Sequence, residues 1–150
     1  MRPIVFALQF RGRAEAVPGS DKERRARSTA PSQTLTTVLE PDGIRTRVDA
    51  LAGDTAILES RVERFGDGTF VEDGTITYGR VGAVTFETVG RGWVAPAPQT
   101  GWVLGGVVWS ITNGTGRLVG ARGLITSNFT VSADGEVVDD HVVRLYVPEE

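Results

Sequence analysis

The chain has 150 residues, of which 40% are hydrophobic and 23% charged, and its 16 basic and 19 acidic residues give a formal net charge of −3. This balance is typical of one soluble globular domain and is too apolar for a disordered chain. The lack of cysteine excludes disulfides, thiolate metal sites and cysteine nucleophiles, and a single histidine excludes a two-histidine metal site. We therefore expect no metal and no cofactor. The slightly acidic charge argues against a nucleic-acid partner, which usually requires a basic face.

The first residues do not resemble an export signal. Residues 4–10 are apolar, but Arg11 and Arg13 follow them and no small-residue cleavage site comes next. No apolar run approaches the roughly 20 residues that a membrane helix needs. We expect a cytoplasmic protein with no membrane partner.

Residues 3–10 predict a first strand, with Ile4, Phe6, Leu8 and Phe10 on one face. The pattern then stops: residues 11–32 carry many arginines, two prolines and two glycines, without a period of 2 or 3.6. Long aperiodic segments in compact domains are usually lids, binding loops or disordered insertions. We predict a flexible basic loop over residues 11–32, which would be a solvated insertion, a lid over a cavity or a contact for an acidic partner.

From residue 33 onward, strand patterns follow one another and are separated by short turns rich in glycine and aspartate. The predicted strands cover residues 35–39, 44–48, 55–64, 69–78, 81–92, 102–113, 117–132 and 136–147. No window shows a helical period. Together with the first segment, these strands predict a single all-β domain over residues 1–150. Glycines inside several strand patterns favour an antiparallel up-and-down β-barrel of eight or nine strands.

The segment Asn113–Gly123, with the sequence NGTGRLVGARG, resembles a motif of allene oxide cyclases and dirigent proteins. In both families a Gly-x-Gly turn is followed by Gly-Ala-x-Gly on the penultimate hairpin of an eight-stranded barrel. The resemblance covers residues 101–148 and implies the barrel fold. It also implies an activity like that of the bacterial polyketide cyclases of this type, which close rings without a cofactor. The chain lacks the export signal and cysteines of plant dirigent proteins.

Polar residues on the inward faces of the strands are the candidates for chemistry, because a buried polar group is costly unless it is used or paired. Glu72 and Tyr78 share a face with Phe70 and Ile76. A carboxyl in apolar surroundings has a raised pKa and can act as an acid or base, and a tyrosine hydroxyl can orient a substrate carbonyl. The alternatives are a solvated position at the barrel rim for Glu72 and a core aromatic for Tyr78.

Asp139 and His141 lie two residues apart on the last strand, in phase with Val137 and Val143. An aspartate beside a histidine can fix its tautomer, so the pair is a candidate acid/base dyad. In the opposite register, His141 would be exposed and Val142 would point inward.

The predicted substrate-binding residues are the remaining inward candidates and one tryptophan near the Pro96–Pro98 loop: Ser60, Phe70, Phe86, Trp102 and Trp109. The tryptophans are expected to wall a cavity, or else to pack in the core or in an oligomer contact.

Three functions remain open. The first is a cofactor-independent cyclase that folds a hydrophobic, polyketide-like substrate in the barrel so that its reacting ends meet. The second is a non-catalytic, lipocalin-like or dirigent-like small-molecule binding protein, and the third is a structural barrel whose oligomer contact matters. We also expect a homodimer or homotrimer.

Overall fold

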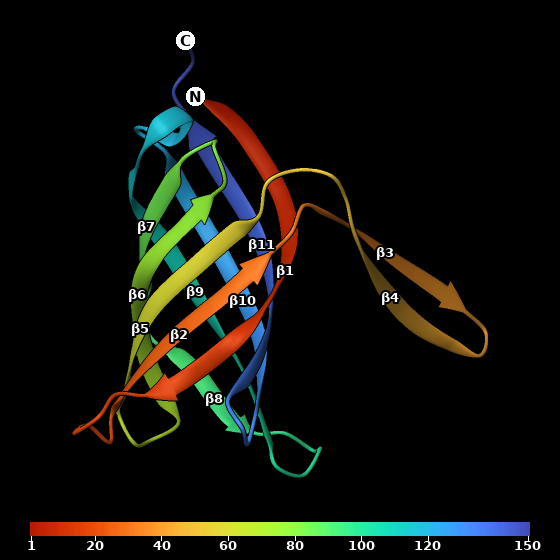
Figure 1. The fold of residues 1–150 in the computed structure, drawn as a ribbon, viewed down its shortest axis with the longest axis vertical. Helices are drawn as coiled ribbons and strands as arrows, with labels where there is room; N and C mark the ends of the chain where they lie inside the picture. Colours follow the sequence, from red (N-terminus) through yellow and green to blue (C-terminus); the bar gives the residue numbers. More distant parts are fainter.

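The computed structural model describes all residues from 1 to 150 and shows a tall β-barrel with a separate hairpin projecting from its side (Figure 1). The strands, in chain order, are β1 (Arg2–Ala16), β2 (Glu23–Ala30), β3 (Gln33–Glu40), β4 (Gly43–Ala50), β5 (Ala56–Arg64), β6 (Thr69–Tyr78), β7 (Ala83–Thr88), β8 (Gly92–Pro96), β9 (Trp102–Gly114), β10 (Arg122–Ser132) and β11 (Glu136–Val147). One 3₁₀ turn, η1 (Gly116–Leu118), lies before β10. No helix of the structure is long and apolar enough to cross a membrane.

The barrel is closed and antiparallel, and neighbouring strands follow one another along the chain. Its order is β1, β2, β5, β6, β7, β9, β10 and β11, and β11 pairs back with β1. The short strand β8 continues the path of β7 and pairs with β6 and β9 at the far end of the barrel. The predicted eight-stranded barrel is confirmed, and β7 with β8 make one interrupted barrel strand.

The prediction of a loop over residues 11–32 is wrong. β1 continues to Ala16, and β2 pairs with it from Arg11 opposite Thr29 to Ala16 opposite Arg24. The inward positions of this hairpin are small residues, such as Gly12, Ala14 and Ala26, and the outward positions are mostly charged. The usual alternation of large apolar and polar residues is therefore absent, although the strand geometry is present.

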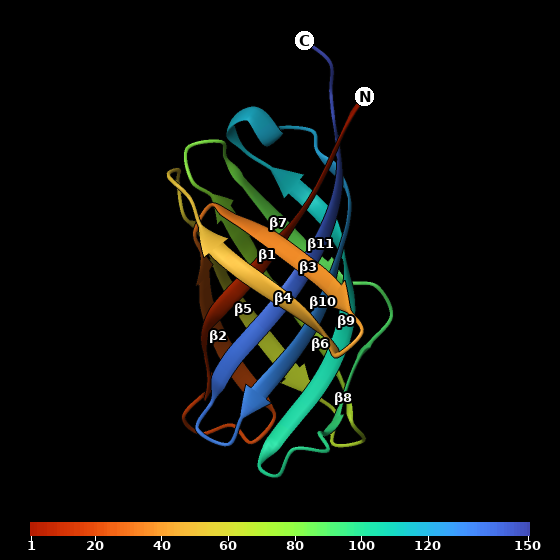
Figure 2. The same ribbon diagram turned by 90° about the vertical axis from the view of Figure 1, so that its right-hand side faces the viewer.

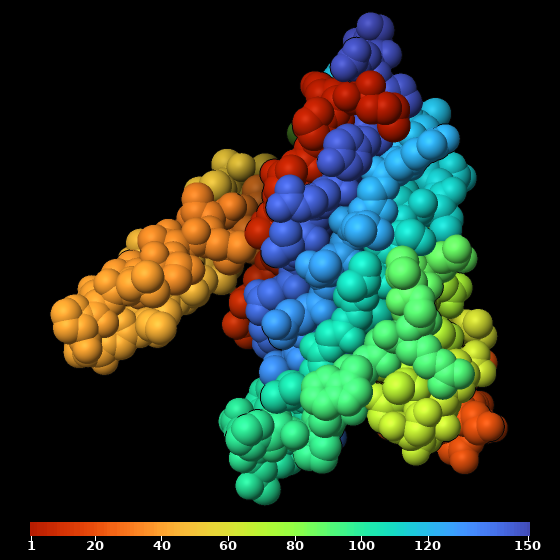
Figure 3. All heavy atoms as spheres, turned by 180° about the vertical axis from the view of Figure 1, so that it is seen from behind, coloured from red at the N-terminus to blue at the C-terminus, as the bar shows by residue number.

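The strands predicted over residues 35–48 exist, but they do not belong to the barrel. β3 and β4 form their own two-stranded sheet, from Gln33 opposite Ala50 to Glu40 opposite Gly43. We call this hairpin the arm. It extends away from the β1 side of the barrel in Figure 1, crosses in front of the barrel in Figure 2, and stands free of the body in Figure 3. Nearly all of its residues are exposed.

The core is the inside of the barrel. Its fully buried large side chains include Phe10, Ile76, Trp109 and Ile125. Leu118 of η1 is buried in the same cluster and helps to close the end of the barrel at which the two chain termini lie (Figure 1). The opposite end is not filled in this way, and the candidate site lies there.

Candidate functional site

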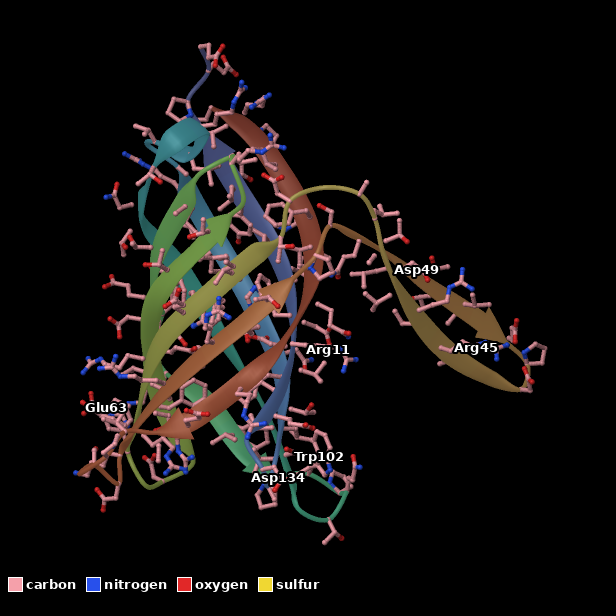
Figure 4. All side chains as sticks on the ribbon, viewed as in Figure 1. Arg11, Arg45, Asp49, Glu63, Trp102 and Asp134 are labelled. Atoms are coloured by element: carbon pink, nitrogen blue, oxygen red, sulfur yellow. The ribbon has the colours of Figure 1, made fainter.

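The half of the barrel away from the termini contains an open cavity of about 550 Å³. Its rim, which we call the mouth, is formed by the turns β1–β2, β8–β9 and β10–β11 together with the end of β5. Figure 4 shows Trp102 and Asp134 at this end of the molecule. The apolar wall consists of Leu58, Val62, Phe70, Val94, Val103 and Phe129. The small inward residues of β1 and β2 leave this space empty.

Two buried carboxyl groups face the cavity from opposite sides of the barrel. Glu72 of β6 is 9% exposed and Asp139 of β11 is 7% exposed, and both line the cavity. Each accepts a hydrogen bond of 2.6 Å from a serine of the neighbouring strand, Glu72 from Ser60 and Asp139 from Ser127. An apolar molecule in the cavity would thus lie between two positioned carboxyl groups.

Glu72 has the environment of a neutral acid. The pKa of Glu72 is raised from 4.5 to about 8, mainly by burial; the hydrogen bond from Ser60 lowers it, and the nearby carboxyls of Asp139 and Asp73 add to the rise. Glu72 therefore carries a proton at neutral pH and can donate it.

Asp139 has two buried hydrogen-bond partners. Its Oδ1 accepts the Ser127 hydroxyl, and its Oδ2 lies 2.9 Å from Nε2 of His141. Nδ1 of His141 is buried without a partner.

The aromatic layer beneath the cavity holds His141 in place. The His141 ring lies 4.5 Å from the Phe10 ring and 5.2 Å from the Trp109 ring, which it meets edge to face. Trp109 in turn stacks on Phe86 at 4.1 Å. The imidazole is thus packed between two aromatic rings, and its Nε2 is directed at Asp139.

The structure brings some of the predicted site residues together and separates others. Glu72, Asp139 and Phe70 line the cavity, while Ser60 and His141 are buried and bonded to the two carboxyl groups. Both members of the Asp139–His141 pair point inward, so the register with an exposed His141 does not occur.

The other three predicted residues do not line the cavity: Phe86, Trp102 and Trp109. Phe86 and Trp109 belong to the aromatic layer, and Trp102 is half-buried at the mouth.

Tyr78 lies away from the cavity. It is at the end of β6 nearer the chain termini, where its ring meets Phe6 edge to face at 5.4 Å. Its hydroxyl is buried without a hydrogen-bond partner, and burial raises its pKa above the ordinary value. Tyr78 therefore does not line the cavity.

Several residues that line or support the cavity are not among the sequence-predicted site residues, including Arg24, Arg64, Ser127 and Phe129. Ser127 and Phe129 are in phase with Ile125 on β10, so the same alternation that selects other residues indicates them. Arg24 lies on β2, where the sequence predicts a loop and no inward face.

No group of three or more histidine, aspartate or glutamate side chains in the structure could hold a metal ion. No family model and no curated protein matches the chain. Among solved structures, it is similar to a pterocarpan synthase dirigent protein with 14% identity and a TM-score of 0.32, over 99% of this chain and 93% of that one. The proposal below therefore rests on the cavity and its side chains.

Proposed function

We propose that the protein is a cofactor-independent cyclase that closes a ring in a hydrophobic small molecule held in the barrel cavity. The observation that carries the proposal is the pair of buried carboxyl groups on opposite walls of the cavity, Glu72 with a raised pKa and Asp139 bonded to Ser127 and His141. A ring closure by addition needs an acid and a base at once, because one reacting end gains a proton and the other loses one.

In this reaction Glu72 donates its proton to a substrate carbonyl oxygen as electron density moves onto it. The nucleophilic end of the same molecule attacks the activated carbon, and its proton passes to Asp139. One new bond forms, one π bond breaks, and the product has the same atoms as the substrate. Transfer of the proton from Asp139 back to Glu72, through the product or water, restores both groups.

The shape of the cavity also contributes to the rate acceleration. Its apolar wall excludes water and folds a flexible chain, so that the two reacting ends are held near each other. Ser60, Ser127 and His141 position the two carboxyl groups and do not themselves touch the substrate.

Each carboxyl has a matched control one residue away on the outside of the barrel. Asp73 and Asp140 are exposed neighbours of Glu72 and Asp139. Hydroxy-enones of ten to fourteen carbons can be incubated with the protein, and products of unchanged mass identified by NMR. We expect Glu72→Gln and Asp139→Asn to lose about 10²–10⁴-fold in rate, while Asp73→Asn and Asp140→Asn retain the parental rate.

A second assay separates the cyclase from a binding protein. The neutral fluorophore N-phenyl-1-naphthylamine should brighten on entering the cavity, and Ala26→Trp, which fills the cavity, should abolish this, whereas Arg25→Trp on the outer face should not. If the fluorophore binds but the parent forms no cyclic product, the cyclase is contradicted and the non-catalytic binding function replaces it. If every carboxyl variant turns over like the parent, the acid and base roles of Glu72 and Asp139 are contradicted.

A further inference from the structure

The inward face of β2 continues beyond the small residues to a positive charge at the mouth. Arg24 is in phase with Ala26, Ser28 and Ala30, all of which point into the barrel. Arg64 is likewise in phase with the inward residues Ser60 and Val62 of the neighbouring strand. Both arginines line the cavity.

Arg24 has no internal partner for its charge. It forms no ion pair or side-chain hydrogen bond, whereas Arg13 at the same mouth pairs with Glu15 and Arg61 on the outer face pairs with Glu23. The Arg64 guanidinium donates only to the backbone carbonyl of Asp21. Burial, and then the nearby charge of Arg64, lower the pKa of Arg24 from its ordinary value. A half-buried guanidinium beside a second one is an unfavourable arrangement unless an anion joins them.

We infer that the cavity takes amphiphilic acids, whose anionic group is bound at the mouth by Arg24 and Arg64 and whose apolar part lies along the wall toward Glu72 and Asp139. The inference rests on the proposed function for the cavity and adds the substrate class. A carboxylate suits the site because a guanidinium can hold it with two parallel hydrogen bonds.

The arrangement also fixes which way the substrate enters. The arginines lie at the open end, and the carboxyl groups lie deeper, above the aromatic layer. The acid group therefore stays at the mouth, and the reacting ends are in the apolar part.

Calorimetric titration with four probes of one chain length tests the inference: decanoate, decyl phosphate, decanol and decyltrimethylammonium. We expect decanoate to bind at least tenfold more tightly than decanol, and decyltrimethylammonium not to bind. Raising the salt concentration should weaken the binding of decanoate and leave the binding of decanol unchanged. Decyl phosphate binding more tightly than decanoate would identify a phosphate as the anionic group in place of a carboxylate.

Arg24→Gln should lower decanoate affinity about tenfold and bring it to that of decanol. Arg25→Gln removes an equal charge from the adjacent, outward position and should change the affinity less than twofold. If Arg24→Gln fails to fold, the ratio of the decanoate and decanol affinities of the parent protein still tests the inference. Equal binding of decanoate and decanol overturns the substrate class but leaves the cavity function standing, whereas binding of none of the four overturns both.

Discussion

The hydroxyl of Thr88 exchanges two hydrogen bonds with the backbone of Glu72. It accepts from the Glu72 amide at 2.7 Å and donates to the Glu72 carbonyl at 2.8 Å. β7 ends at Thr88 and β8 begins at Gly92, so no backbone partner is available to β6 at this point. A side chain thus completes the sheet where the proposed acid is attached.

Replacing this hydroxyl should loosen the sheet at Glu72. Thr88→Val keeps the shape but leaves an amide and a carbonyl without partners, at a cost of about 1–3 kcal/mol in the free energy of unfolding. Thr88→Ser, which keeps the hydroxyl, should cost much less. Urea denaturation of both variants measures the difference, and equal stabilities would show that the two bonds are unimportant.

Glu72 should make stability depend on pH. Its pKa in the folded protein, about 8, lies above that of an unfolded glutamate, so the folded state holds the proton more tightly. The resulting stabilisation is complete below pH 4.5 and is lost as the pH rises to about 8. Relative to Glu72→Gln, the parent should lose up to about 4 kcal/mol between pH 5 and pH 8.

The pH experiment compares thermal or urea unfolding of the two proteins across this range. Asp140→Asn serves as the control, because its carboxyl is exposed and does not contribute to the pKa of Glu72, so its loss should leave the parental pH profile unchanged. Parallel profiles for the parent and Glu72→Gln would contradict a raised pKa at Glu72.

Gly74 should not tolerate a side chain. A Cβ there would lie 2.3 Å from the carbonyl oxygen of Glu59 and 2.8 Å from Cα of Ser60, and backbone atoms cannot move aside. Gly74→Ala should therefore destabilise the barrel by about 1–3 kcal/mol. Gly43→Ala, in the turn of the arm, adds a Cβ in open space and should change the melting temperature little.

The arm should be dispensable for the barrel. Its removal leaves β2 and β5 paired, since Ala30 lies opposite Ala56, and the amide of Leu51 already donates to the carbonyl of Ser32 at 2.7 Å. The Gln33 side chain bonds to the amide and carbonyl of Gln9 on β1. We therefore expect a variant that keeps Gln33 and joins it directly to Leu51 to retain the β-rich circular dichroism spectrum and to melt within a few degrees of the parent. Loss of cooperative unfolding would show that the arm supports the fold.

The arm and the β1–β2 hairpin are the two parts of the fold that the sequence did not predict correctly. Alternation correctly predicted that residues near 35–39 and 44–48 form strands, but it contains no information on which sheet they join. Arg45 and Asp49, labelled in Figure 4, share a face of a hairpin that stands in solvent. Membership of a barrel depends on pairing partners far along the chain, which local patterns do not specify.

Conversely, the alternation of large apolar and polar residues by itself predicted the strands of the filled half of the barrel and the inward direction of Glu72 and Ser60. This alternation is absent from β2, because the inward residues Ala26 and Ser28 face the cavity and are small. The inward direction of Asp139 and His141 was one of two registers allowed by the sequence, and the pairing of β11 with both β1 and β10 selected it. Only closure of the barrel placed Glu72 and Asp139 on facing walls, because these residues are on strands that do not pair with each other.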